Sequence, residues 1–174
     1  MYRFNDLTFI CYNWMPCVAD HVLDLQESFY RSAGVSRLHS SDTFDPSKVQ
    51  DGDLIFVKTD FIFNGIFESR FLNKINANFN LITGVSSYQL GKDSHGSYNR
   101  ILNNPKVKRW FCVHPPNKSH EKIVPLPIGF QEPDRPGGNQ VFLERIKMMR
   151  RDFSDKQNKI FLPYHDLSTN RNRR

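Results

Sequence analysis

The stretch that decides the fold is Asp-Leu-Ile-Phe-Val-Lys-Thr-Asp at residues 53–60, together with the fifteen residues after it and Leu-Ile-Thr-Gly-Val-Ser-Ser at residues 81–87. The first and last of these segments contain short, continuous apolar runs, which are typical of strands buried on both faces. Between them, apolar residues recur every four positions from Phe63 to Ile75, and this spacing predicts one helix over residues 61–75. Two such strands with a helix between them predict parallel neighbours joined by a crossover.

The same alternation extends in both directions along the chain. Strands are expected at residues 7–12, 53–58, 80–84, 107–113, 122–126 and 159–162, and helices at residues 20–31, 61–75, 97–102 and 140–151. This order predicts an α/β fold: an open, doubly wound, Rossmann-like and mostly parallel sheet with helices on both faces. Ligands of such sheets bind beyond the carboxyl ends of the strands, where the strand order reverses.

Length and composition set limits on the class of protein. The chain has 174 residues, 39% of them apolar, with 15 Phe and a formal net charge of +6. This length corresponds to one core, which we place at residues 1–155, with residues 156–174 starting a second domain. The aromatic content excludes intrinsic disorder, and charges interrupt every stretch that could span a membrane. No signal peptide is recognisable, so we expect a cytoplasmic protein.

Metal and disulfide chemistry are not indicated. Three cysteines, Cys11, Cys17 and Cys112, are an odd number without Cys-x-x-Cys spacing, and the six His are scattered. We therefore expect reduced thiols and no metal cofactor.

A basic run at residues 145–151 has two interpretations. It is either a patch for phosphates or nucleic acid, or the solvated face of a helix. We favour the solvated face, because the run lacks interleaved aromatic residues for base stacking.

The residues just after each expected strand are the candidates for a site. Asp60 follows the strand at 53–58 and is either the N-cap of the next helix or a carboxylate at the mouth of a cleft. We favour the cap, although a capping carboxylate held at a strand end is also placed to act on a ligand.

Three further candidate positions follow strands. The run Gly-Val-Ser-Ser-Tyr at residues 84–88 can offer backbone N–H groups and hydroxyls to a ligand, although such a loop is more often a simple turn. His114 follows the strand at 107–113 as a structural residue or a general base. Trp110 is expected in the sheet unless its indole is exposed to stack on a sugar ring. Glu132 follows the last strand, where Pro125 and Pro127 predict a sheet edge.

Four segments in this order resemble the amino-terminal half of exostosin-like glycosyltransferases, including forms found in large DNA viruses and microbes. They are residues 53–60, residues 81–87, Asn-Pro-Lys-Val-Lys-Arg-Trp-Phe at 104–111 and Ile-Val-Pro-Leu-Pro-Ile-Gly-Phe at 123–130. The resemblance spans about residues 50 to 171, and the run ending in Thr169-Asn170-Arg171 is similar to the start of that family's second domain.

The resemblance implies a GT-B architecture, in which the amino-terminal domain receives a glycan acceptor and the carboxyl-terminal domain holds a nucleotide sugar without a metal ion. It further implies an inverting transfer that needs a general base, for which Asp60 is our first choice, ahead of Glu132 and His114. Acceptor contacts are expected from Ser86, Ser87, Tyr88 and Trp110, and donor contacts from Thr169, Asn170 and Arg171.

Two other functions stay open at this stage. If the chain ends at Arg174, we expect either a separate chain that supplies the donor-binding half or a non-catalytic carbohydrate-binding domain derived from such an enzyme. A nucleic-acid-binding domain is the third and weakest interpretation, and it predicts binding that falls steeply with salt.

Overall fold

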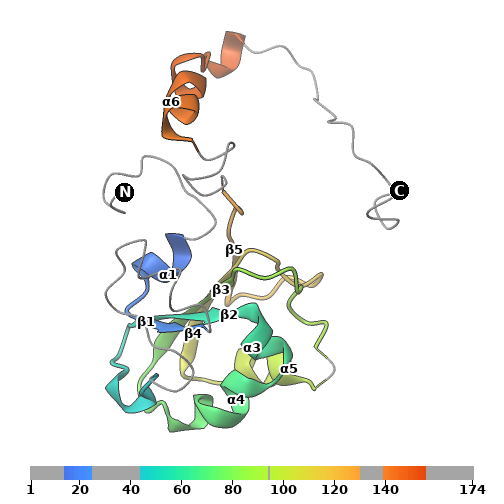
Figure 1. Ribbon diagram of the computed structural model, residues 1–174. Coiled ribbons are helices and arrows are strands. Elements are labelled where there is room, and N and C mark those ends of the chain that lie inside the picture. The colour runs from blue at the N-terminus through green and yellow to red at the C-terminus, as the bar shows by residue number, and fades with distance from the viewer. Residues whose placement is uncertain (1–13, 25–43, 94, 130–138, 156–174) are drawn as a thin grey trace.

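The chain forms an α/β fold around a five-stranded, all-parallel sheet (Figure 1). The structure, a computed structural model, describes residues 14–24, 44–93, 95–129 and 139–155. The strands lie side by side in sequence order: β1 (His21–Leu23), β2 (Leu54–Lys58), β3 (Phe79–Gly84), β4 (Val107–Cys112) and β5 (Ile123–Pro125). The Rossmann-like α/β prediction is confirmed. Among these five strands the order does not reverse, and the strands expected at 7–12 and 159–162 lie outside the described residues.

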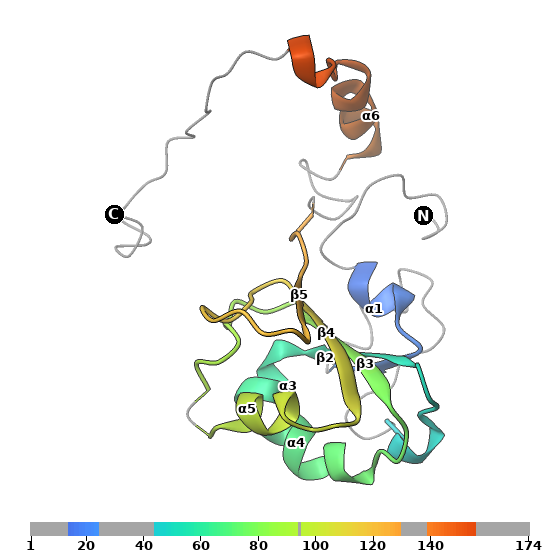
Figure 2. The same cartoon turned by 180° about the vertical axis from the view of Figure 1, so that it is seen from behind.

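Helices cover both faces of the sheet (Figures 1 and 2). One face carries α3 (Thr59–Phe63), α4 (Ile66–Arg70), η3 (Leu72–Lys74) and α5 (Ser97–Leu102), and the other carries α1 (Trp14–Val18). The remaining short elements are η2 (Pro46–Lys48), α6 (Gln140–Met148) and η5 (Phe153–Asp155). In the described part of the chain, no helix has the length and apolar character needed to cross a bilayer.

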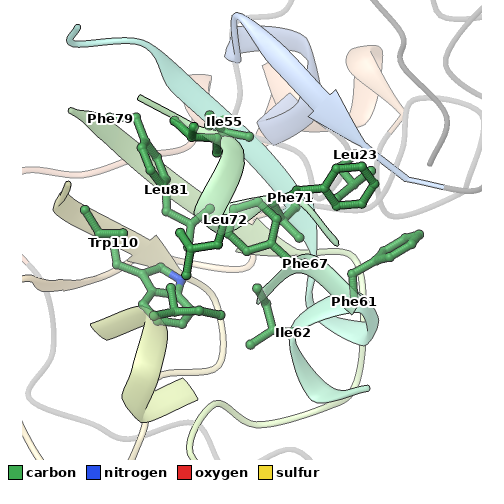
Figure 3. Packing of buried hydrophobic residues seen from close by; sticks show 14 of the residues in the cluster. Leu23, Ile55, Phe61, Ile62, Phe67, Phe71, Leu72, Phe79, Leu81 and Trp110 are labelled. Carbon is green, nitrogen blue, oxygen red and sulfur yellow. The ribbon is translucent and has the colours of Figure 1, made fainter. Parts of the chain in front are cut away.

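The core consists of two layers because side chains alternate along each strand. On the side of α3 to α5, Ile55, Leu81 and Trp110 pack against helical residues such as Phe67 (Figure 3). On the opposite side, a smaller cluster joins strand residues such as Phe56 to α1. The central strands are therefore buried on both faces, which explains their continuous apolar sequences.

The helix predicted over residues 61–75 is divided into α3, α4 and η3. The division falls at Gly65, whose φ of 70° lies in the left-handed region that favours glycine. Its N–H donates to the Ile62 carbonyl and ends α3. The repeat of apolar residues every four positions was correct for burial, since Phe67, Phe71 and Ile75 are all in the core. The prediction of one continuous helix was wrong.

The helix predicted to begin at Asp20 is also wrong over its first residues, which form β1. Val22 packs in the cluster with α1 and Leu23 in the cluster with α3 to α5, as alternating strand residues must. Asp20 caps no helix there, because its Oδ2 accepts a hydrogen bond from the Leu54 N–H at 2.9 Å. Residues 25–31 lie outside the described residues.

A carboxylate links β1 to β2 at the amino-terminal ends of these strands. Asp53 Oδ2 accepts one hydrogen bond from the Gln50 N–H and one from His21 Nε2, each at 2.8 Å. Both bonds favour the ionised carboxylate. Asp53 therefore joins the start of β2 to the start of β1 through a side-chain hydrogen bond.

Other elements match the predictions closely. The helix α5 has the predicted bounds, and β5 lies at one edge of the described sheet, as its prolines indicated. The helix α6 begins at the predicted residue and ends at Met148. Arg145, Lys147, Arg150 and Arg151 are all exposed, as both interpretations of the basic run require.

Candidate functional site

The carboxyl ends of β2, β3 and β4 meet at one edge of the sheet. Lys58 of β2 pairs with Gly84 of β3, and Thr83 of β3 pairs with Cys112 of β4. Asp60, Ser86 and His114 each lie two residues beyond one of these paired positions. The register thus brings three predicted site segments to the same edge.

Asp60 lies in the first turn of α3, which immediately follows β2. The N-cap of this helix is Lys58, and no side chain caps it, so the predicted capping role of Asp60 is wrong. The Oδ2 atom of Asp60 is buried and has no hydrogen-bond partner among the described residues. Just before it, Thr59 Oγ1 donates to the Gly84 carbonyl at 3.3 Å and fixes the turn from strand to helix. The turn from β2 to α3 therefore fixes the position of Asp60, and its Oδ2 atom has no hydrogen-bond partner in the described structure.

The loop after β3 brings Tyr88 against Phe63 of α3, the helix that contains Asp60. Val85 has a φ of 54°, a sparsely populated backbone conformation for a β-branched residue. Ser86 Oγ accepts a hydrogen bond from the Tyr88 N–H at 3.2 Å. The Tyr88 ring stacks on Phe63 of α3 with centroids 4.1 Å apart and planes 10° apart. Ser87 and Tyr88 are exposed.

A second loop, after β4, is hydrogen-bonded to the first. The Leu90 N–H donates to the His114 carbonyl at 3.1 Å, and Gln89 Nε2 donates to the Pro115 carbonyl at 3.0 Å. The same Gln89 amide donates to Asn117 Oδ1 at 2.8 Å. His114 is half-buried in this loop. The two loops consequently form one connected rim along the carboxyl edge.

Gly84 has a packing role at this edge. A Cβ at this position would lie 2.8 Å from the Sδ of Met15, which is fully buried in α1. A side chain at this position would therefore force the Met15 side chain, which lies between α1 and the end of β3, to shift. This role is independent of any ligand.

Trp110 packs in the sheet, as expected from the sequence, so the acceptor contact that the resemblance implies for its indole is not available in this structure. Its side chain is fully buried, and its indole Nε1 donates to Thr83 Oγ1 at 2.9 Å. The ring also packs against Tyr98 of α5, with centroids 5.5 Å apart. No face of this indole is available to a sugar.

Cys112, at the end of β4, is close to the rim but is not a nucleophile. Burial raises the pKa of its thiol to about 12, so the reactive thiolate is negligible near neutral pH. Among the described residues, no group of three or more His, Cys, Asp and Glu side chains is arranged to hold a metal ion.

Several site residues were missed or could not be placed. Phe63 was assigned to the buried side of a long helix, although its position one turn after Asp60 is a signal that the two share a face. Asp24 is 2% exposed directly after β1 and was hidden by the wrong helix prediction. The predicted residues Glu132, Thr169, Asn170 and Arg171 lie outside the described residues.

Comparison with known proteins does not extend this picture. No protein-family model matches the chain, and no curated protein matches it either.

Proposed function

We propose that this chain is the acceptor-side half of an exostosin-like glycosyltransferase, which transfers a sugar from a nucleotide sugar to a glycan hydroxyl with inversion. The observation that supports the proposal best is Asp60, whose buried Oδ2 has no partner among the described residues at the carboxyl edge of the sheet. Asp60 as a whole is only partly buried, and a carboxylate at this edge can receive a proton from a ligand hydroxyl. The sequence resemblance supplies the class of reaction.

The proposed reaction requires one base on the acceptor side. As the acceptor oxygen forms its bond to the anomeric carbon, the bond from that carbon to the nucleoside diphosphate breaks. The hydroxyl proton passes to the Asp60 carboxylate, and the nucleoside diphosphate leaves with the bonding electrons. Ser86 and Ser87 hydroxyls orient other hydroxyls of the acceptor. His114 and Glu132 are the alternative bases.

The partners follow from this proposal. They are a glycan acceptor and a nucleotide sugar, with Thr169, Asn170 and Arg171 contacting the donor and no metal ion required. The donor-binding half is supplied either by further residues of the same protein or by a separate chain. The proposed location is the cytoplasm.

A turnover assay tests the role of Asp60. The protein, together with its donor-binding half, is incubated with a panel of nucleotide sugars and oligosaccharide acceptors, and release of nucleoside diphosphate is measured. We expect Asp60→Asn to lower kcat by about a hundredfold or more with little change in the acceptor KM, because general-base catalysis contributes this much. Asp152→Asn, at an exposed carboxylate outside the rim, is the matched control.

Unchanged turnover in Asp60→Asn would exclude Asp60 as the base. His114→Ala and Glu132→Gln would then identify which of the alternatives acts, and three active variants would remove the proposed mechanism altogether.

A non-catalytic carbohydrate-binding domain is the second candidate. It is favoured by the exposed, stacked Tyr88, because flat aromatic rings bind sugars without any chemical step. Glycan binding that leaves every nucleotide sugar intact would support this candidate over the first.

A further inference from the structure

The stacked pair of Phe63 and Tyr88 presents a flat apolar surface at the carboxyl edge. The two rings are nearly parallel, and 41% of the Tyr88 surface remains exposed. Phe63 covers one face of the Tyr88 ring, and Tyr88 nevertheless stays among the exposed large hydrophobic residues of the described structure. This surface can receive a second flat or chair-shaped apolar group.

The Tyr88 ring is held in place from both sides along the chain. On one side, Val85 adopts its left-handed conformation and the Ser86 hydroxyl accepts the Tyr88 N–H. On the other, Gln89 and Leu90 are hydrogen-bonded to the loop after β4. A ring that is already ordered loses little conformational freedom when a ligand binds, which favours binding.

Polar groups surround this apolar surface. A small hollow beside it is lined by Thr59, Ile62 and Phe63 of α3 and by residues 89–91 and Asp93 of the loop. Asp60 precedes Phe63 by three residues, so both lie on the same side of α3. The hollow is bordered by the Gln89 amide, whose oxygen can accept a hydrogen bond from a hydroxyl group, and by the Asp93 carboxylate.

A neutral pyranose has the complementary chemistry. Its axial C–H groups form an apolar face, and its equatorial hydroxyls radiate from the edge of the ring. Stacking of the apolar face on Tyr88 would bring hydroxyls near the side-chain oxygens of Gln89 and Asp93. A sugar acid fits less well, because its own carboxylate would approach the carboxylate of Asp93.

We propose that the Phe63–Tyr88 pair is the platform on which a neutral pyranose of the acceptor stacks, one helical turn from Asp60. The assignment of this sugar as an acceptor rests on the proposed function, whereas the stacking itself does not. Tyr88 acts here through its ring, in addition to the hydrogen bonding expected from the sequence.

Binding of simple glycosides tests the platform. Methyl β-galactoside, methyl β-glucoside and methyl β-glucuronide are titrated separately into the full chain, and saturation-transfer NMR identifies the sugar protons that contact the protein. We expect at least one neutral glycoside to bind through the C–H protons of one face, and the glucuronide to bind more weakly than either.

Substitutions at Tyr88 separate the flat ring from other properties of the side chain. Tyr88→Ala and Tyr88→Leu should each weaken binding about tenfold, since loss of about 1.4 kcal/mol corresponds to this factor. Tyr88→Phe keeps the ring and should retain affinity within about twofold, a change of only a few tenths of a kcal/mol. Phe142→Ala, at a 52% exposed aromatic on α6, is the matched control and should bind as the wild type does.

The possible outcomes distinguish this proposal from the proposed function. Undiminished binding by both Tyr88→Ala and Tyr88→Leu, or no binding of any neutral glycoside to the wild type, overturns the platform. If Asp60→Asn abolishes turnover while Tyr88→Ala leaves the acceptor KM unchanged, the platform is wrong and the transferase stands. If Tyr88→Ala loses glycoside binding and no nucleotide sugar is ever consumed, the platform stands and the transferase is wrong.

Discussion

Asp60→Asn should make the protein more stable. A buried polar atom without a hydrogen-bond partner costs about 1 to 3 kcal/mol, and more when the group is charged; Oδ2 of Asp60 is such an atom among the described residues, and Asp60→Asn keeps a polar atom there but removes the charge. A negative charge in the first turn of a helix contributes about 0.3 to 1 kcal/mol in the opposite direction. The first effect is larger, because α3 has only five residues and Asp60 does not cap it. We therefore expect a net gain of about 1 kcal/mol in the free energy of unfolding.

Urea denaturation followed by circular dichroism measures this difference, and thermal unfolding should show a rise of about 2 to 4 °C for a chain of this size. Asp53→Asn provides the contrasting control. That carboxylate accepts two hydrogen bonds at 2.8 Å, so its neutralisation should lower the free energy of unfolding by about 2 kcal/mol. A loss of stability in Asp60→Asn similar to that in Asp53→Asn would refute the argument, because it would show that Asp60 stabilises the fold.

Three other predictions concern the core and the strand ends. Iodoacetamide at pH 8 should modify the partly exposed Cys17 and spare the buried Cys112, whose thiol has a pKa of about 12, and peptide mass spectrometry would reveal the opposite pattern. Trp110→Phe should lower the free energy of unfolding by about 2 kcal/mol in urea titrations, because a cavity forms and Thr83 loses its buried donor. Although burial raises the pKa of Asp53, the hydrogen bonds outweigh it and lower this pKa below 3.8. The stabilisation is therefore present above pH 3.8 and lost as the pH falls below it, so the stability difference between wild type and Asp53→Asn should close in acid, and a constant difference would contradict this.

The central strands could be predicted from sequence because they are buried on both faces. Continuous apolar runs leave few alternatives, and β2, β3 and β4 begin and end within one residue of their predicted bounds. The helix α5 was equally clear, since Asn103, Asn104 and Pro105 end it. The residues within and directly after these elements are sufficient to predict where each element begins and ends.

The errors arose where tertiary packing outweighs a local pattern. The segment that begins at Asp20 has helical apolar spacing, yet Val22 and Leu23 are buried on opposite faces of the sheet, which only a strand allows. In the segment 61–75, one glycine with a positive φ divided a regular repeat. A local pattern cannot distinguish one long helix from two short helices that bury the same residues.

The sequence predicted where the candidate residues lie in the sheet better than it predicted what their side chains contact. Residues that follow parallel strands reach one edge whatever their chemistry, so Asp60, Ser86, Tyr88 and His114 were found from strand order alone. The hydrogen bond from Trp110 to Thr83 and the stacking of Phe63 on Tyr88 depend on contacts between distant segments. Such contacts leave no signal in the spacing of residues along the chain.

The order of the strands bears on how the protein is made. Each of the described strands β2 to β5 lies next to the strand that precedes it in the chain. The neighbour with which a new strand pairs has therefore already been synthesised. A ribosome releases residues far more slowly than helices and hairpins form. The sheet can therefore grow from β1 to β5 in step with translation, and each new strand pairs along the edge formed last. At the end of this growth, Pro125 and Pro127 supply too few N–H groups for an incoming strand to pair along that edge.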